Sequence, residues 1–320
     1  GLPGFAAKQI ARWIYEKRVD SIESMTDLSK TGRSRLEDRY TVGLCPPIAS
    51  AKSSDGTVKY LFPGRNGRDI ETVYIPDRDR ATLCVSSQAG CKMGCRFCMT
   101  GRQGFHGNLD TYDIINQVLA IPDSLSLTNI VFMGMGEPMD NYDAVVRAIE
   151  VLTAPWGLAW SPKRITVSTI GKTDTLRRLL DETKVHVAIS VHSPFPVERE
   201  ELMPVEKAYP VKSVMELLRG YDFSHQRRLS MEYIMWRGIN DDMRHARGLA
   251  RLVNGLDCRI NLIRYHAIEG GADAMMPPDT ATMEAFRDAL NDMGIIATIR
   301  TSRGEDIAAA CGMLAGQKKE

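Results

Sequence analysis

The chain has 320 residues, of which 43% are hydrophobic and 25% charged, a composition typical of soluble enzymes with a large core. The formal net charge is only +1, so global charge does not indicate a nucleic-acid-binding protein, and a polyanionic partner would need local basic patches. No apolar run approaches the roughly 20 residues of a membrane span, so we expect no membrane association. Seven cysteines, an odd number, fit a cytoplasmic location better than a disulfide framework.

Residues 1–48 are predicted to form a small helical accessory domain. The stretch AAKQIARWIYEKR has the apolar spacing of an amphipathic helix, and two shorter segments of this kind follow at 22–29 and 34–40. Residues 1–40 hold eight Lys or Arg and six Asp or Glu, a net charge of +2. The domain is either a solvated cap or a module that docks on an RNA backbone. Pro46 and Pro47 end it, because proline lacks a donor and disfavours helix before it.

Residues 49–80 are predicted to form a β-hairpin extension, with strands at 57–62 and 70–75 around a Pro-Gly-Arg-Asn-Gly turn at 63–67. From residue 81 to 320, strand-like apolar runs alternate with helical stretches. The strands are predicted at 81–86, 129–133, 164–168, 185–191, 230–235 and 259–263. The helices are predicted at 111–121, 142–152, 172–182, 210–223, 241–252 and 281–292.

This alternation predicts an α/β fold with a parallel sheet and right-handed crossovers. Six such strands are expected to close into a partial (β/α)6 barrel. In parallel barrels the chemistry gathers at the C-terminal ends of the strands, and the motifs described next fall there.

Three cysteines in GCKMGCRFCMTGRQGF, Cys91, Cys95 and Cys98, are spaced C-x3-C-x2-C. A structural zinc site or a ferredoxin-type cluster uses four protein ligands. Three thiolates on a [4Fe–4S] cluster leave one iron open to the amino and carboxylate groups of S-adenosylmethionine (SAM). The spacing, with Phe97 before the last cysteine, is typical of radical-SAM enzymes. The alternative is a zinc knuckle that borrows a distant ligand, such as His106 or another cysteine.

The segment Gly134-Met135-Gly136-Glu137-Pro138 follows a predicted strand. Glycines allow a close approach between the backbone and a ligand, and a carboxylate suits the ammonium group of SAM, so Gly136 and Glu137 are the predicted site for that group. Other strand ends offer polar groups for the ribose, carboxylate or adenine of SAM. These predicted contacts are Ser168, Ser190, Val191, His192 and His266. Taken alone, each would more simply be a capping or core polar group.

Three segments resemble the RlmN/Cfr family, whose members are radical-SAM enzymes that methylate an adenine ring carbon in RNA. The segments are LCVSSQAGCKMGCRFCMTGRQGFHGNL, GMGEPMDNY and TSRGEDIAAACGMLAG, and the resemblance covers essentially the whole chain. The run Gln103-Gly104-Phe105 resembles the RlmN branch, which methylates C2, and methylation of C8, as in the Cfr branch, is the alternative. The resemblance implies an adenosine of 23S rRNA and one beside the tRNA anticodon as substrates. It also implies a reducing electron donor such as flavodoxin and two SAM molecules per turnover.

The resemblance implies roles for three residues outside the cysteine cluster. Adenine C2 is electron-poor and cannot attack the SAM methyl group by polar displacement, so the family first moves a methyl group onto a cysteine, here Cys311. SAM cleaved at the cluster supplies the radical that abstracts a hydrogen from this S-methyl group, and the carbon radical adds to C2. Glu71 is then the implied base for the C2 proton. Cys84 is the implied thiol that attacks the Cys311 sulfur, which forms a transient disulfide and frees the RNA.

Without the resemblance, Glu71 would be expected to be a solvated strand carboxylate and Cys84 a buried strand cysteine. Cys45 and Cys258 match no part of the pattern and are interpreted as structural thiols. His266 stands where many family members carry Asn, and both side chains present one donor and one acceptor. Two alternative functions remain open for this sequence. One is another kind of radical-SAM enzyme, such as an activase or a sulfur-inserting enzyme, and the other is an RNA-binding protein with a structural zinc site. Neither explains Cys84 and Cys311.

Overall fold

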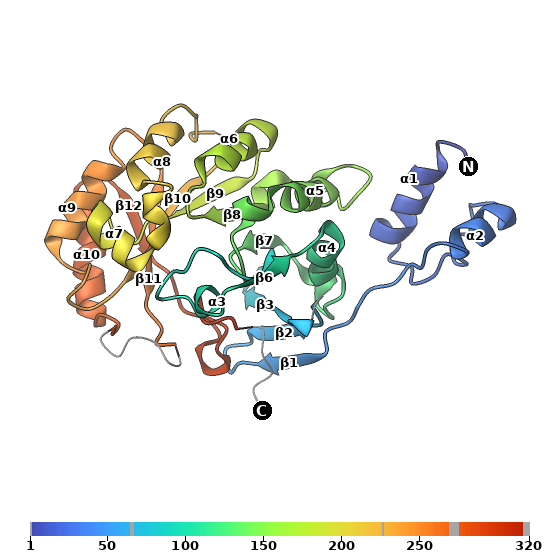
Figure 1. Cartoon of the computed structure of the whole chain (residues 1–320), viewed down its shortest axis with the longest axis horizontal. Coiled ribbons are helices and arrows are strands. Elements are labelled where there is room, and N and C mark those ends of the chain that lie inside the picture. The colour runs from blue at the N-terminus through green and yellow to red at the C-terminus, as the bar shows by residue number, and fades with distance from the viewer. Residues whose placement is uncertain (1, 65–66, 226, 269–274, 316–320) are drawn as a thin grey trace.

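The computed structural model describes residues 2–64, 67–225, 227–268 and 275–315. A small helical N-terminal unit lies at one end of the molecule, and a curved sheet with helices on its outer side makes up the rest (Figure 1). The sheet has ten strands in the order β1-β2-β3-β4-β7-β8-β9-β10-β11-β12. Among the described helices, none has the length and apolar character needed to cross a membrane.

The N-terminal unit contains α1 (Ala6–Ala11), a π-helical continuation η1 (Arg12–Glu16) and α2 (Lys30–Glu37). It has a small core of its own, formed by Ala6, Ile22, Met25 and Leu28. The predicted helix at 22–29 is wrong. That stretch forms successive turns, in which Met25 N donates to Ile22 O and Leu28 N donates to Met25 O. The helix predicted at 34–40 begins earlier, because the Ser29 side chain caps α2 by accepting from Gly32 N.

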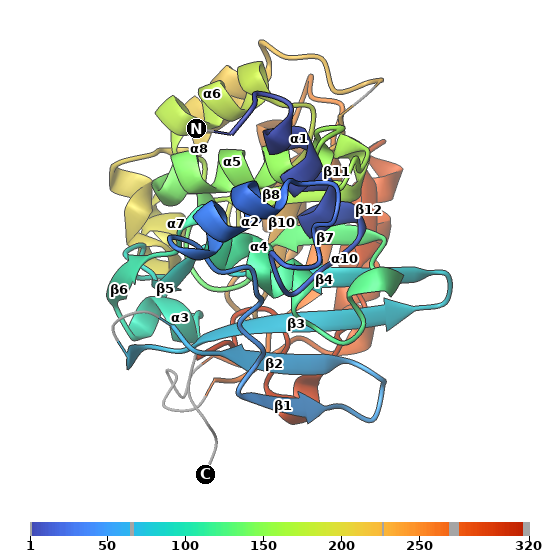
Figure 2. The same ribbon diagram turned by 90° about the vertical axis from the view of Figure 1, so that its right-hand side faces the viewer.

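The predicted β extension is present and has one strand more than expected. It consists of β1 (Ala49–Lys52), β2 (Val58–Phe62) and β3 (Ile70–Asp77), joined antiparallel. Strand β3 also pairs antiparallel with β4 (Arg80–Cys84), so the extension continues directly into the barrel sheet (Figure 2). Of the turn predicted at 63–67, residues 65 and 66 lie outside the described part of the chain.

The predicted parallel barrel is confirmed, and all six expected strands are present. Each strand pairs parallel with the next. They are β4, β7 (Asn129–Phe132), β8 (Ile165–Thr169), β9 (His186–Ser190), β10 (Leu229–Met235) and β11 (Arg259–Arg264). A seventh parallel strand, β12 (Ile296–Ile299), was not predicted; it pairs with β11 at the edge of the sheet.

Helices cover the outer side of this sheet, and most follow the predicted stretches. They are α4 (Thr111–Leu119), α5 (Tyr142–Thr153), α6 (Thr173–Glu182), α7 (Pro196–Leu202), α8 (Val211–Leu218), α9 (Met243–Leu252) and α10 (Thr280–Asp292). Aspartates cap three of them, since Asp110, Asp242 and Asp279 each accept a backbone N–H of the first turn. Helix α7 was not predicted. Short 3-10 turns complete the fold at η3 (Ser124–Ser126), η4 (Pro138–Asn141), η5 (Pro162–Arg164), η6 (Pro204–Lys207) and η7 (Glu305–Ile307).

A small hairpin brackets the cysteine-rich loop. Strands β5 (Gln88–Gly90) and β6 (Phe105–Asn108) pair antiparallel, and α3 (Met99–Arg102) lies between them in the chain. The loop with the three clustered cysteines therefore leaves and re-enters the barrel next to the end of β4. This places the motif at the edge of the barrel where the parallel strands end.

Candidate active site

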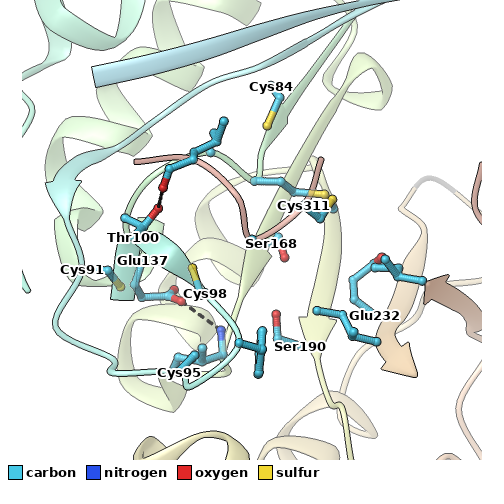
Figure 3. Close-up of a pocket in the computed structure, with 18 of the residues that line it drawn as sticks. Cys84, Cys91, Cys95, Cys98, Thr100, Glu137, Ser168, Ser190, Glu232 and Cys311 are labelled. Carbon is cyan, nitrogen blue, oxygen red and sulfur yellow. Dashed lines mark hydrogen bonds between the residues drawn. The ribbon is translucent and has the colours of Figure 1, made fainter. Parts of the chain in front are cut away.

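A pocket with a cavity volume of about 180 Å³ lies at the C-terminal ends of the barrel strands (Figure 3). Five of the seven cysteines line it, although they come from both ends of the sequence. They are Cys84, Cys91, Cys95, Cys98 and Cys311. Its walls also include five of the predicted SAM contacts, which are Gly136, Glu137, Ser168, Ser190 and His192. The fold thus brings together residues that the sequence separates by more than two hundred positions.

Phe97 fixes the cysteine loop against the barrel. Its ring is buried and meets the His192 ring edge-on, with 4.8 Å between centroids, and the Trp236 ring at 5.2 Å. The backbone helps, because Arg96 N donates to Leu202 O at 3.0 Å. The aromatic residue before the last cysteine therefore acts as an anchor that holds the loop to the ends of β9 and β10.

Burial controls the electrostatics of the three clustered thiols. It raises the pKa of Cys91 to about 12 and raises the pKa values of Cys95 and Cys98 above their ordinary range. Such thiols keep their protons until a cationic partner displaces them, and iron does so when it binds. Among the described residues, no three His, Cys, Asp or Glu side chains lie close enough to bind a single metal ion. A four-iron cluster is larger and takes its thiolates from further apart. His106 does not line the pocket, and its Nε2 lies 3.1 Å from Gln103 O.

Glu137 is buried and links the ends of β7 and β8. One carboxylate oxygen accepts from Met139 N at 3.0 Å, and the other accepts from Ile170 N at 3.0 Å. Burial raises the pKa of Glu137 to about 7, although hydrogen bonds from Thr169, Ile170 and Met139 act in the opposite direction. Each carboxylate oxygen can accept more than one hydrogen bond, so Glu137 can still accept from an ammonium group in the pocket.

The glycines before Glu137 line the pocket, and they also have a structural reason that the sequence did not indicate. A Cβ on Gly134 would lie 2.7 Å from Val85 O, and one on Gly136 would lie 2.4 Å from Gln88 Cβ. Gly136 also has a φ of 95°, which side chains disfavour. The glycines therefore let the strand end pass close to the segment after β4, whereas the sequence suggested only a close approach to a ligand.

Of the three residues at the end of β9 that were predicted to contact SAM, two line the pocket and one is hydrogen-bonded within the protein. Ser190 and His192 line the pocket, but Val191 does not. The Val191 backbone is already engaged, since its N–H donates to Glu232 O at 3.0 Å and its carbonyl accepts from Arg199 Nε at 3.0 Å. His192 Nδ1 accepts from Ile234 N at 3.1 Å. Burial and the nearby Arg199 charge lower the pKa of His192 to about 3, so the ring is neutral with its proton on Nε2.

His266 lies in an adjoining groove and does not line the pocket. Its Nε2 is 2.8 Å from Ser302 Oγ, and its Nδ1 is 3.5 Å from Glu305. The groove that contains it shares Cys311 with the active-site pocket. His266 thus lines the same groove as Cys311, whereas none of the three clustered cysteines lines that groove.

The segment that carries Cys311 is bound to the cysteine loop. Met99 N donates to Gly312 O at 2.7 Å, and Thr100 Oγ1 donates to Leu314 O at 2.7 Å (Figure 3). Cys311 itself is exposed, whereas Cys84 is buried at the end of β4 and points toward it. Burial raises the pKa of Cys84 to about 12; proximity to Cys311 adds to this rise, and the Arg300 charge opposes it.

Glu71 is not the solvated carboxylate that its position in a strand suggested. Its side chain is 2% exposed, one oxygen forms an ion pair with Lys59 Nζ at 2.9 Å, and the other accepts from Ala315 N at 2.7 Å. It does not line the pocket. Instead, its carboxylate holds the end of the segment that carries Cys311. The contact joins residues 244 positions apart in the chain, so no local pattern could reveal it.

Comparisons with known proteins agree with this geometry. Residues 85–249 match the radical SAM superfamily, and residues 1–42 match the ribosomal RNA large subunit methyltransferase N-terminal domain. A probable dual-specificity RNA methyltransferase RlmN from Parabacteroides distasonis is 57% identical over 99% of this chain and 92% of its own length. The dual-specificity RNA methyltransferase RlmN of Bdellovibrio bacteriovorus is 41% identical over 100% of this chain and 80% of its own.

Among solved structures, a radical SAM methyltransferase from Sphaerobacter thermophilus superposes with a TM-score of 0.91 at 38% identity, covering 99% of this chain and 94% of its own. The chain belongs to the RlmN family. The expected family and barrel fold are thereby confirmed. Streptococcus suis SuiB bound to S-adenosylmethionine shares only the fold, with a TM-score of 0.52 and 13% identity over 73% of this chain and 57% of its own.

Membership of the RlmN family settles the cofactors. Radical SAM enzymes use a [4Fe–4S] cluster and SAM, and these are the cofactors of this chain. The pocket fits them, because three thiols of one loop line it, Cys95 buried and Cys91 and Cys98 half-buried, together with polar residues at the strand ends. The assignment of individual residues to cluster and SAM stays a prediction.

Sequence reasoning missed two buried charged residues at this site. Arg199, in α7, donates to the carbonyls of Ile170, Ser190 and Val191 at 2.9–3.2 Å and forms an ion pair with Glu206. Glu232, in β10, lines the pocket, and one of its oxygens has no hydrogen-bond partner among the described residues. No motif marks either position, since a single charged residue in an ordinary helix or strand carries no distinguishing signal.

Cys45 and Cys258 lie away from the pocket and half-buried. The backbone of Cys45 pairs with the Asn116 side chain, with both hydrogen bonds at 2.8 Å. Burial raises the pKa of Cys258 to about 12. The interpretation of both as structural thiols agrees with this placement.

Proposed function

We propose that this chain methylates C2 of an adenosine in 23S rRNA and of an adenosine beside the tRNA anticodon, as the name of its dual-specificity relatives suggests. The observation that carries the proposal is the meeting of Cys311 and Cys84 in the pocket that the three clustered cysteines line. A radical SAM enzyme that only activates a partner or inserts sulfur gives these two thiols no task.

In this proposal Cys91, Cys95 and Cys98 hold the cluster. When bound, the cluster and SAM supply a methyl group and a 5′-deoxyadenosyl radical. Gly136 and Glu137 receive the ammonium group of SAM. The remaining contacts to SAM come from the ends of β8 and β9, at Ser168, Ser190 and His192, which line the pocket; the other two predicted contacts, Val191 and His266, lie outside its lining.

Two thiols and a carboxylate carry the rest of the reaction. Cys311 accepts the methyl group and, through it, becomes joined to C2 of the RNA adenine. Glu71 accepts the C2 proton; its carboxylate forms an ion pair with Lys59 Nζ at 2.9 Å and holds Ala315, at the end of the segment that carries Cys311. Cys84 then attacks the Cys311 sulfur, so that an S–S bond forms while the bond from sulfur to the RNA methylene breaks. The methylene carbon keeps the electron pair of that bond and takes up a proton to become the methyl group, and two electrons from the reductant return the disulfide to thiols. Arg300 favours the thiolate form of Cys84 that attack requires.

Three further assignments complete the proposal. A reducing protein such as flavodoxin delivers electrons to the cluster, and the enzyme works in the cytoplasm, away from membranes. The disulfide between Cys84 and Cys311 is transient. Residues 1–48 form the RNA-docking domain, residues 49–80 the β-hairpin extension, and residues 81–320 the barrel with its methyl-carrier segment.

The test is an anaerobic assay of the reconstituted protein with SAM, reductant and unmodified 23S rRNA or tRNA. Digested RNA is compared by chromatography and mass spectrometry with 2-methyladenosine and 8-methyladenosine standards, because these isomers share one mass. We expect 2-methyladenosine in both RNAs and a brown protein with broad iron–sulfur absorption. The 8-methyl isomer would establish the alternative, and a colourless zinc protein without product would refute an enzymatic function. The Cys98→Ala variant, which should lose both iron and 5′-deoxyadenosine formation, is the control.

A further inference from the structure

A second cavity, of about 580 Å³, adjoins the active-site pocket. The residues that line both spaces are Ile75, Val131, Ile263, Arg300, Ala309, Ala310 and Cys311. Cys311 is exposed and stands in the shared wall. A base that reaches Cys311 must therefore leave its ribose and phosphates in a neighbouring space, and the pocket itself already contains the clustered thiols and the predicted SAM contacts.

This cavity, which we call the arginine groove, is lined by Arg78, Arg80, Arg300 and Arg303. The acidic residue of its lining, Asp77, forms an ion pair with Arg303 at 3.3 Å. Arg78 and Arg80 are exposed, and no described residue forms an ion pair with either. Arg300 also has a carboxylate partner, Glu232, at 3.5 Å. Arg78 and Arg80 are therefore the two cations of this groove whose charge no described residue balances, and they mark a local anion-binding surface.

The backbone that carries these arginines is held in place on both sides. Arg78 has a φ of 49°, a left-handed conformation that is uncommon outside glycine and that here belongs to the tight turn between β3 and β4. On the opposite side, Gly304 N donates to Asp55 Oδ2 at 2.9 Å. Fixed backbones give a charged ligand a preformed track, which reduces the entropy lost on binding.

We infer that the arginine groove binds the ribose-phosphate backbone of RNA on either side of the target adenosine, with Arg78 and Arg80 contacting phosphates. The inference rests on the proposed function, and it identifies the surface on which the RNA substrate would lie. Arginine suits phosphate because its planar fork can donate two parallel hydrogen bonds. Phosphate contacts position a nucleic acid without reading its sequence, which suits an enzyme that accepts two different RNAs. They also offset the few kcal/mol needed to extrude a base from its stack.

The test is the double variant Arg78→Gln/Arg80→Gln, with binding of an unmodified tRNA transcript measured across a range of salt concentrations. Each lost phosphate contact reduces the slope of log K against log salt by about 0.7–0.9, so we expect a flatter slope and an affinity about tenfold lower or more near physiological salt. The variant Arg247→Gln/Arg251→Gln removes two exposed arginines from α9 and should bind like the native protein. Arg78→Lys/Arg80→Lys should keep the salt slope, because lysine still pairs with phosphate.

Binding and turnover together separate failure of this inference from failure of the proposed function. If the native protein makes no methyladenosine, the proposed function fails whatever the groove does. If it methylates RNA and the Gln variant binds with an unchanged slope, the groove is not the RNA track. A variant that binds RNA normally and loses turnover with flavodoxin, but not with a chemical reductant, would make the groove a docking site for the electron donor and overturn the inference.

Discussion

Cys84 and Cys311 differ in burial, and this difference fits the separate tasks proposed for them. The methyl carrier must meet SAM and then RNA, and Cys311 is exposed at the junction of two cavities. The resolving thiol acts only on Cys311 and is shielded from other partners, as Cys84 is at the end of β4. Burial raises the pKa of Cys84 to about 12, so this thiol is protonated at neutral pH.

The first prediction follows from these separate tasks. Cys311→Ala cannot accept the methyl group, so it should bind RNA and make no methylated adenine. Cys84→Ala should still accept the methyl group on Cys311 and join it to the RNA, then stall. We expect a covalent protein–RNA species in denaturing gels that RNase shortens. If Cys84→Ala turns over normally without such a species, the two-thiol mechanism is wrong for this chain.

The second prediction concerns the raised pKa of Glu137. In the folded protein this pKa is about 7, above the 4.5 of an ordinary glutamate. The protonated Glu137 side chain therefore contributes to the free energy of unfolding. This contribution is fully present below pH 4.5 and is lost as pH rises through 7, because the folded protein must then bury a charged carboxylate. The loss amounts to about 3 kcal/mol. Urea unfolding of metal-free protein at pH 5 and pH 8 measures it, and Glu137→Gln should lack this pH dependence. Equal pH dependence in both proteins would place the titration elsewhere.

The sequence predicted many of the residues that the fold brings to this pocket, but it did not predict how they are held. Cys91, Cys95 and Cys98 are close in the chain, so spacing alone indicated their shared task. Glu71 looked like a solvated carboxylate, because its partners Lys59 and Ala315 reach it only when β2 and the C-terminal segment close over β3. Burial of a polar group is a tertiary property, and strand alternation does not reveal it.

At the scale of elements, the pocket depends on how the ends of β8 and β9 are tied together. Arg199 does this from α7 through three backbone carbonyls, and its charge is balanced by Glu206. The arginine is fully buried. Removing one member of a buried ion pair costs about 3–5 kcal/mol, because the other charge is left without a partner.

The third prediction is that Arg199→Met destabilises the protein by about that amount and also weakens SAM binding, through looser strand ends. The double variant Arg199→Met/Glu206→Leu should recover much of the stability, because no buried charge remains. It should not recover SAM affinity, because the carbonyls of Ile170, Ser190 and Val191 would still lack the hydrogen bonds that Arg199 donates. Chemical unfolding and equilibrium binding of SAM under anaerobic conditions measure the two effects. Full recovery of SAM affinity in the double variant would mean that Arg199 contributes to stability alone.

The elements that sequence periodicity missed are short or stabilised by distant contacts. Strand β12 has four residues, and Ile296 at its start is 53% exposed, so it lacks the apolar run of a buried strand. In the stretch 22–29, Ile22, Met25 and Leu28 recur every three residues, which suggests a helix. Successive turns give the same spacing, because each also closes a hydrogen bond over three residues. The longer barrel helices were predictable because their apolar faces repeat over several turns.

At the scale of the whole molecule, the N-terminal unit is a separate body with its own core, joined to the barrel by few contacts (Figure 1). Tyr112 Oη donates to Gly43 O at 3.3 Å, the Tyr15 and Trp156 rings lie 6.1 Å apart, and the Cys45 backbone pairs with Asn116. Such a unit can be removed without opening the barrel core, provided that the cut preserves the Cys45 pairing.

The last prediction is that deletion of residues 1–42 uncouples the two reactions of the enzyme. The pocket lies entirely in the remaining chain, so the truncated protein should keep its cluster and cleave SAM at a rate close to that of the full chain. RNA methylation should fall much further, because RNA would be held only by the barrel and its salt-dependent contacts would be fewer. The measurement is the ratio of methyladenosine to 5′-deoxyadenosine, with iron content and circular dichroism as controls for folding. A truncated protein that keeps the full ratio would show that the N-terminal unit is a structural cap, and RNA docking would then depend on the barrel face alone.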